Sequence, residues 1–348
     1  MSAVLALMAA IWALGAAFRV PGRVRALAVG MVWLGVMLAQ VVLPEGAALR
    51  IATGGRAEPW LVLGGVVLLV LGYRAALRRI RARAKPDAPP LAPGSFSDAE
   101  LSRYARHILL REVGGAGQKR LKAARVLVVG AGGLGSPAIL YLAAAGVGTI
   151  GVIDDDMVED SNLQRQIIHT DNRIGLPKVQ SAMIAARALN PFVEIRPYQR
   201  RLDADTAREL IAGHDLVLDG TDNFDTRYLV NRVCAELGIP LVAAAITQWE
   251  GQIGLYDPAQ GGPCHECVFP VRPAPGLVPA CAEAGVIAPL PGVLGSMMAL
   301  EAVKRLTGAG ETLQGRMMIY DGLQGDARVI RTRRRSGCAA CGGHGDPA

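Results

Sequence analysis

The chain has 348 residues, enough for one large domain or two ordinary ones, and 51% of them are hydrophobic. Residues 1–85 hold 11 basic and 2 acidic residues, whereas the rest of the chain holds 26 basic and 28 acidic residues. The net charge of +7 therefore comes from the first part of the chain. This distribution argues against a basic nucleic-acid-binding surface on the larger part, and we expect no nucleic-acid partner.

Three apolar runs of 17, 18 and 18 residues lie near the N-terminus, and only the third contains a charge, Arg74. Each run is near the length that crosses a hydrocarbon core of about 30 Å. A cleaved signal peptide would need a basic start, which Met1-Ser2 does not offer, and it would leave two runs unexplained. We therefore predict a membrane segment at residues 1–80, with helices at about 2–18, 26–43 and 60–77.

The charges around these runs predict an orientation. Three arginines separate the first two runs and five basic residues follow the third, whereas the second loop balances two arginines with two glutamates. Because basic loops stay in the cytoplasm, we predict a multi-pass protein of the inner (cytoplasmic) membrane with its C-terminal part in the cytoplasm. Residues 81–96 are basic and then proline-rich, which is typical of an extended linker.

Strand and helix patterns alternate after residue 125. This alternation predicts an α/β fold with a Rossmann-like, doubly wound and mostly parallel sheet, extended by antiparallel strands near the C-terminus. A helix over Leu101–Leu110 precedes it, with a capped start at Ser97. Parallel strands are predicted at Arg125–Val129, Thr149–Asp154, Val193–Tyr198, Leu216–Asp219 and Leu241–Ala245, and helices at Leu134–Ala145, Lys178–Leu189, Asp203–Ala212 and Asp225–Leu237. Antiparallel strands are predicted at Gly251–Tyr256, Arg316–Tyr320 and Ala327–Ile330.

A glycine-rich turn follows the first strand, at Gly130–Gly135, and Asp154 ends the second strand. Glycines let the backbone approach a phosphate, and an acidic residue at that position can bind a ribose. Alone, this pattern would also suit an NAD-linked dehydrogenase. The polar run Asn162–Gln166 favours a triphosphate instead, because it places an amide and a guanidinium just beyond Asp154.

Ordered motifs between about residues 97 and 342 resemble those of the ThiF/MoeB/HesA adenylyltransferases, relatives of the ubiquitin-activating enzymes. The matching pieces are Arg103–His107, Gly130–Gly135, Ser161–Gln166, Pro177-Lys178, Asp219–Asp225, Cys264–Cys267, Cys281–Val286 and Cys338–Cys341. The resemblance assigns residues 97–348 to one such domain and implies a homodimer.

The resemblance also implies roles for single residues. Asp154 would hold the ribose of ATP, Arg106 would reach the phosphates from the partner subunit, and Asp222 would coordinate Mg²⁺, a hard cation that prefers oxygen ligands. Asn162, Arg165 and Lys178 would hold the phosphates. The expected nucleotide-binding set is Gly133, Gly135, Asp154, Asn162, Arg165, Lys178, Asp222 and Asn223.

Two CxxC pairs, Cys264/Cys267 and Cys338/Cys341, predict a closed structural Zn²⁺ site. The alternative, two redox-active pairs, lacks a thioredoxin-like context. Cys234 lies in an apolar helical pattern and is expected to be a packing residue. Cys281 lies in the proline- and glycine-rich segment Pro270–Pro291, which we expect to form a loop. In the family such a cysteine bonds to the carrier or its sulfur in some members and is dispensable in others, so a bystander thiol stays possible.

The resulting hypothesis is ATP-dependent adenylation of the C-terminal glycine of a small ubiquitin-like sulfur carrier, of the molybdopterin or thiamine biosynthesis type, with sulfur supplied by a separate donor protein. A carboxylate nucleophile is already ionised near pH 7, so the reaction needs positioning and fixed positive charge rather than a general base. Two alternatives stay open. One is activation of another carboxylate or of a tRNA nucleoside, and the other is a membrane scaffold that binds nucleotide without turnover.

Overall fold

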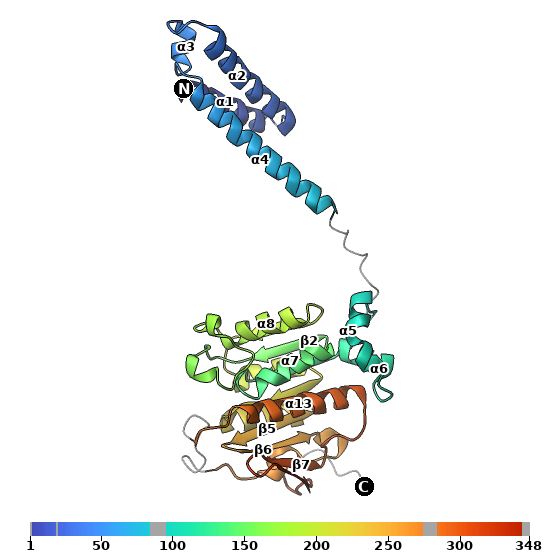
Figure 1. Cartoon of the computed structure of the whole chain (residues 1–348). Coiled ribbons are helices and arrows are strands. Elements are labelled where there is room, and N and C mark those ends of the chain that lie inside the picture. Colours follow the sequence, from blue (N-terminus) through green and yellow to red (C-terminus); the bar gives the residue numbers. More distant parts are fainter. Residues whose placement is uncertain (1, 19, 84–94, 274–283, 343–348) are drawn as a thin grey trace. The chain divides into compact units, whose positions relative to one another are not determined.

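The computed structural model describes residues 2–18, 20–83, 95–273 and 284–342. Its contacts divide the chain into two compact units, Met1–Pro90 and Leu91–Ala348 (Figure 1). The first unit contains helices α1 (Ser2–Ala17), α2 (Gly22–Val42), α3 (Ala48–Ala52) and α4 (Glu58–Arg83). The second unit contains the sheet and the helices that cover it.

The structure corrects the predicted number of membrane-spanning helices, which was three. Among the described residues, two helices are long and apolar enough to cross a membrane, over Gly22–Val42 and Glu58–Leu77. Helix α1 forms as predicted but has 16 residues, which at 1.5 Å per residue reach about 24 Å and fall short of a hydrocarbon core of about 30 Å. Helix α4 also continues to Arg83, into the stretch predicted to be linker.

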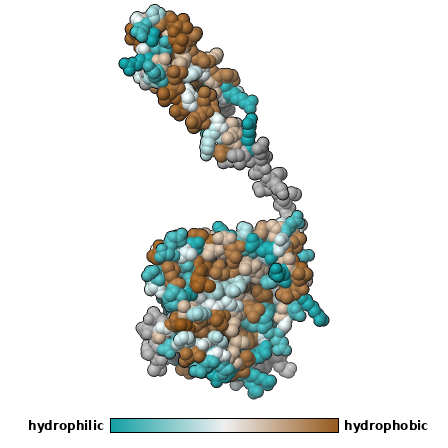
Figure 2. All heavy atoms as spheres, in the orientation of Figure 1, coloured by the Kyte–Doolittle hydropathy of each residue, from teal (hydrophilic) through white to brown (hydrophobic). Residues whose placement is uncertain are grey.

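Tryptophan and glutamine side chains hold the first unit together. Trp33 Nε1 donates to Trp60 O at 3.1 Å, and Trp60 Nε1 donates to Thr53 O at 3.0 Å. Gln40 Nε2 donates to Thr53 Oγ1 at 2.6 Å, which ties α3 to α2. Most apolar side chains of α4 remain outside this cluster, including Leu68 and Leu69, which are 71% and 73% exposed. Figure 2 shows hydrophobic residues over much of the visible surface of this unit.

The described residues of the second unit form one eight-stranded sheet in the order β3-β2-β1-β4-β5-β6-β7-β8. Strands β1 to β5 pair in parallel, and β6, β7 and β8 extend the sheet antiparallel. The predicted fold class is therefore confirmed. The strands are β1 (Arg125–Val129), β2 (Thr149–Ile153), β3 (Glu194–Tyr198), β4 (Leu216–Asp219), β5 (Leu241–Thr247), β6 (Glu250–Tyr256), β7 (Arg316–Asp321) and β8 (Asp326–Arg331).

Helices cover both faces of the sheet, which makes it doubly wound. One hydrophobic core contains residues of α7, α8 and α13, and a second contains residues of α9 and α10. Helix α5 starts at the capping box of Ser97 and Glu100, as predicted. The helices are α5 (Asp98–Ile108), α6 (Gly114–Ala123), α7 (Gly135–Ala145), α8 (Lys178–Leu189), α9 (Ala204–Ala212), α10 (Phe224–Leu237), α11 (His265–Val268) and α13 (Pro289–Thr307).

Helix α13 corrects the prediction that Pro270–Pro291 is all loop. Its first residues include Pro289 and Pro291, which the first helical turn accepts because its N–H groups need no partner within the helix. The helix packs against α7 so closely that a Cβ on Gly295 would lie 2.2 Å from Leu134 O. Residues 274–283 lie outside the described residues.

Candidate functional site

The loops after β1 and β4 meet at the centre of the sheet. Strand β1 lies between β2 and β4, so the chain leaves it in opposite directions, and ligands of such sheets bind at this switch point. A Cβ added to Gly130 would lie 3.4 Å from Gly220 O, and one added to Gly220 would lie 3.2 Å from Gly135 N. The two loops therefore lie against each other beyond the carboxyl ends of the strands.

The loop Gly130–Gly135 has a backbone that requires glycine at two positions. Gly130 adopts a φ of 93°, and a Cβ on Gly135 would lie 1.9 Å from Gly130 O. Helix α7 follows directly, and its N-cap residue, Leu134, has no side-chain acceptor for the first amides of the helix. Such a helix start is suited to bind an anion, which agrees with a phosphate site.

Asp154 braces this loop. Its Oδ2 accepts from Ala131 N at 2.7 Å and its Oδ1 accepts from Asp156 N at 2.9 Å. Burial raises the pKa of the Asp154 carboxyl, and the two backbone amides act in the opposite direction. The Asp154 carboxylate thus sits at the end of β2 and beside the glycine loop, where the sequence predicts a ribose-binding group.

The polar run after β2 also lies beside the loop. Asn162 is buried, and its Oδ1 accepts from Gln166 Nε2 at 2.7 Å. Arg165 NH1 donates to Ser161 O at 3.1 Å. A Cβ placed on Gly133 would lie 3.9 Å from Arg165 Cγ, so the arginine stem passes next to the glycine loop. Asn162 and Arg165 are therefore brought to the predicted phosphate site.

Lys178 begins helix α8 and is 5% exposed. Its Nζ lies 2.7 Å from Asp156 Oδ2, and its charge lowers the pKa of Asp154 in opposition to burial. One carboxylate oxygen from each of Asp154, Asp155 and Asp156 lies within 4.8 Å of the others. The described residues thus place one lysine and three carboxylates close together beside the glycine loop.

Asp222 and Asn223 follow β4 on the loop that contacts Gly130. The Asp222 side chain is exposed and faces solvent. Asn223 caps helix α10, because its Oδ1 accepts from Thr226 N at 3.1 Å. The sequence assigned Asn223 to nucleotide binding, and in the structure its amide oxygen is already used by the cap.

Arg106 lies away from these groups. Its neighbour Tyr104 packs at the far end of α7, where a Cβ on Gly146 would lie 2.5 Å from Tyr104 Cζ. Since α7 has 11 residues and rises about 16 Å, Arg106 is at the opposite end of that helix from the glycine loop. Its predicted role was in a partner's site, which this placement leaves possible. Cys281 lies outside the described residues.

His169 and Gln166 were missing from the predicted set. His169 is buried, and its Nδ1 lies 2.9 Å from Ser181 Oγ while its Nε2 lies 2.9 Å from Ala131 O. Gln166 is 4% exposed and bonded to Asn162. In the sequence, His169 is visible only as a histidine three residues after the polar run and directly after two isoleucines. That pattern by itself suggests a core residue.

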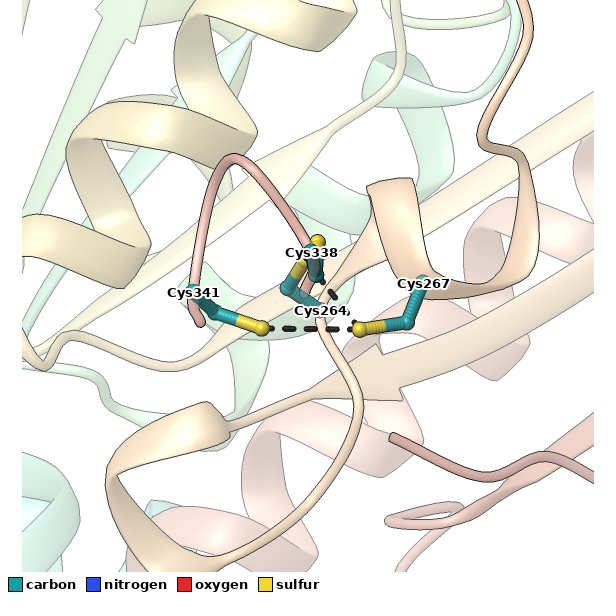
Figure 3. Close-up of side chains that lie close together, drawn as sticks. All are labelled: Cys264, Cys267, Cys338 and Cys341. Carbon is teal, nitrogen blue, oxygen red and sulfur yellow. Dashed lines mark hydrogen bonds between the residues drawn. The ribbon is translucent and has the colours of Figure 1, made fainter. Parts of the chain in front are cut away.

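The four cysteines of the CxxC pairs converge as the sequence predicted (Figure 3). The distance between Sγ atoms is 3.7 Å for Cys264 and Cys267, 3.6 Å for Cys264 and Cys338, and 3.4 Å for Cys267 and Cys341. A tetrahedral Zn²⁺ with bonds of about 2.3 Å has sulfur–sulfur edges of about 3.8 Å. Four buried thiols at this spacing fit such an ion.

The surroundings of the cysteines act differently on the individual thiols and leave histidine out. Burial raises the pKa of Cys264, and it raises the pKa of Cys341 to about 11. Burial raises the pKa of Cys338, but amides of Cys341 and Ala340 oppose it, with sulfur contacts, and bring the pKa down to about 7. Burial lowers the pKa of His265 to about 3, and its ring packs against Tyr228, Tyr256 and Phe269. Cys234 is 2% exposed in the core, as expected of a packing residue.

A Rossmann-like sheet with a glycine loop at its switch point is typical of nucleotide-binding folds, and the same unit also contains a cluster of four buried cysteines. The chain belongs to the ThiF family, whose model matches residues 104–340. It is 50% identical over 248 residues to the SAMP-activating enzyme E1 of Haloferax volcanii, covering 71% of this chain and 91% of that protein.

A second relative is the sulfur carrier protein adenylyltransferase of Thermus thermophilus, which is 49% identical over 251 residues, covering 71% of this chain and 93% of that protein. Among solved structures, E. coli MccB shares the fold with a TM-score of 0.62 and 22% identity, over 72% of this chain and 75% of that chain. The residues that the family model matches, 104–340, lie within the second unit.

Proposed function

We propose that the protein uses ATP and Mg²⁺ to adenylate the C-terminal glycine carboxylate of a small ubiquitin-like sulfur carrier and releases pyrophosphate. The observation that carries the proposal is the glycine loop with Asp154, Arg165 and Lys178 gathered at the switch point, in a chain about half identical to named sulfur-carrier and SAMP-activating enzymes. Bond formation joins a carboxylate oxygen to the α-phosphorus, and the bond to pyrophosphate breaks. No proton has to move, because the attacking oxygen is already ionised.

The charge of each residue determines the part of the nucleotide or the ion that we assign to it. The glycine loop and the start of α7 receive the phosphates, and Asp154 receives the ribose. Arg165 and Lys178 stabilise the charge that develops on the phosphates, with Asn162 as a further donor. Asp222 is the residue that we assign to Mg²⁺, which would neutralise phosphate charge when bound. The exposed position of Asp222 leaves its carboxylate accessible to the ion.

A homodimer completes the site in this proposal. Beside Arg106, an apolar groove of about 250 Å³ lies between α5, α7 and α13, and its lining residues are His107, Tyr141, Ala145, Ser296, Ala299, Leu300 and Val303. Tyr141 and Leu300 are each 58% exposed. A second copy on this face would cover them and carry Arg106 toward the partner's phosphates.

We also assign Zn²⁺ to the four cysteines, with a structural role because four thiolates close its coordination shell.

The first unit is proposed as a membrane anchor. The outward apolar face of α4 supports this assignment over a soluble core helix, which would be buried. Two groups of basic residues favour a cytoplasmic second unit: those that follow Leu77, within and after α4, and Arg19, Arg23 and Arg25 at the junction of α1 and α2. ATP and reduced thiolates are both available in that compartment.

Carrier-dependent exchange of pyrophosphate into ATP tests the proposal. The purified full-length protein in detergent is mixed with ATP, Mg²⁺, labelled pyrophosphate and each candidate carrier ending in glycine. Label should enter ATP only with an intact carrier. Nucleotide binding without exchange, across all carriers of the organism, would instead support a scaffold.

A further inference from the structure

We propose that His169 is a positioning residue that fixes the glycine loop after β1 against helix α8, which carries Lys178. The inference rests on the proposed function, since it concerns how the nucleotide site is kept in shape. His169 joins two elements that hold the phosphates in that proposal, and both of its ring nitrogens are bonded to protein groups. The residue therefore acts through its neighbours.

The two ring nitrogens have different partners, and the partners fix the tautomer. Nε2 lies 2.9 Å from Ala131 O, which can only accept, so Nε2 carries the proton. In a neutral ring Nδ1 is then an acceptor, and the Ser181 hydroxyl, 2.9 Å away, donates to it. Both polar atoms of a 5%-exposed side chain are thus satisfied.

The bond to Ala131 reaches the centre of the phosphate loop. Ala131 N donates to Asp154 Oδ2 at 2.7 Å, and Ala131 O accepts from His169. Both backbone polar groups of one loop residue are therefore held, one by the predicted ribose ligand and the other by His169. The carbonyl cannot turn toward the bound phosphates, where it would repel them, without breaking the bond to the histidine.

The bond to Ser181 reaches the helix that carries Lys178. Ser181 lies three residues after Lys178 in α8, close to one helical turn, and is fully buried. Ser181 O also accepts from Arg173 NH1 at 3.1 Å. A movement of the loop away from α8 would therefore stretch the contact through His169. This contact is one of two links between the loop and Lys178, and the other runs through Asp154 and Asp156.

The ring contributes geometry rather than charge. Burial lowers the pKa of His169, the bond to Ala131 opposes this, and the positive charges of Lys178 and Arg173 lower it further. The ring is neutral at physiological pH, so removing it leaves the electrostatic field at the phosphates unchanged. A loss of ATP affinity in a His169 variant would then show that phosphate-binding groups have moved, because no charge has been removed.

The test compares ATP affinity, by calorimetry with Mg²⁺ and the full-length protein in detergent, across three variants. His169→Phe keeps the ring shape and loses both bonds, and we expect its Kd for ATP to rise at least about tenfold. His169→Gln restores a donor near Ala131 O and should recover most of that affinity. His214→Phe is the matched control. His214 is also 5% exposed and bonded to Leu210 O at 2.7 Å, but it precedes β4 and so lies at the amino ends of the parallel strands, opposite to the glycine loop.

Similar melting temperatures for His169→Phe and His214→Phe, with weak ATP binding only in the former and rescue by glutamine, support the proposal. Wild-type ATP affinity in His169→Phe, equal loss in His214→Phe, or no rescue by glutamine overturns it. Should His169→Phe fail to fold, Ser181→Ala removes the bond on the α8 side and must also weaken ATP binding. ATP binding needs no carrier, so absent pyrophosphate exchange in the wild type counts against the proposed function alone.

Discussion

Lys178 Nζ lies 2.7 Å from Asp156 Oδ2, with side chains that are 7% and 64% exposed. The ammonium is thus nearly buried and also stands at the start of α8, where the helix dipole disfavours positive charge. Stability alone does not explain a lysine at that position. Binding of an anionic ligand does, because a phosphate supplies the second negative partner that the buried ammonium favours.

Replacement of Lys178 by Met should therefore separate activity from stability. We expect carrier-dependent pyrophosphate exchange to fall at least ~100-fold, because a preorganised positive group is removed from the reacting phosphates. The melting temperature should stay the same or rise. Arg208→Ala removes an exposed partner of Glu236 and serves as the control, with activity within about twofold of the wild type. Near-normal exchange in Lys178→Met would remove this residue from the site.

The metal content of the protein should depend on the four clustered cysteines and not on Cys234. Purified protein should contain about one equivalent of zinc, and Cys341→Ser should lose it and melt at a lower temperature, because metal binding adds directly to folding free energy. Cys234→Ala is the matched control, since this cysteine is equally buried but outside the cluster. Loss of zinc in the Cys234 variant, or full zinc in the Cys341 variant, contradicts the assignment.

Stability should fall in mild acid through His214. Burial lowers the pKa of this histidine below its ordinary value of 6.5, so between the folded pKa and 6.5 the unfolded chain binds more protons than the folded chain. Its contribution to the free energy of unfolding is complete above pH 6.5 and is lost as the pH falls. His214→Phe should flatten this pH dependence in denaturant titrations, even if it lowers stability at every pH. An unchanged slope would show that the histidine is not held neutral.

The first unit should behave as an anchor that the enzyme domain does not need for chemistry. The full-length protein is expected in the membrane fraction and in detergent extracts, because the apolar surface of α2 and α4 is otherwise left in water. A truncated chain beginning at Pro93 should be soluble and retain exchange activity. Recovery of the full-length chain in the soluble fraction without detergent, or removal of the second unit by protease outside intact spheroplasts, rules out the topology.

The fold was largely predictable because its signals are local. Buried apolar runs such as Arg125–Val129 and Leu216–Asp219 have the observed bounds, and the glycine turn marks the crossing from strand to helix. Helix α13 was missed because its first turn carries two prolines and follows a proline-rich stretch, which usually marks a loop. The number of membrane spans was overestimated because run length was counted through Phe18, beyond the end of α1 at Ala17.

The site was predictable in its composition and less so in its geometry. The sequence motifs pointed to Arg165 and Lys178. They did not show that the amide oxygen of Asn223 accepts a hydrogen bond in a helix cap. His169 could not be found from spacing, because its function depends on contacts with Ala131 and Ser181, which are far apart in sequence and meet only in the folded sheet. Such contacts are set by packing, which sequence periodicity does not encode.

Direct detection of the adenylated carrier tests the central claim most closely. The full-length protein is incubated with ATP, Mg²⁺ and a purified carrier, pyrophosphatase is added to drive the reaction forward, and the carrier is examined by mass spectrometry. The account predicts a carrier heavier by one AMP unit at its C-terminal glycine, and no such species from a carrier that lacks that glycine or with Lys178→Met. Unmodified carrier in every case, or an AMP adduct that survives removal of the terminal glycine, would contradict it.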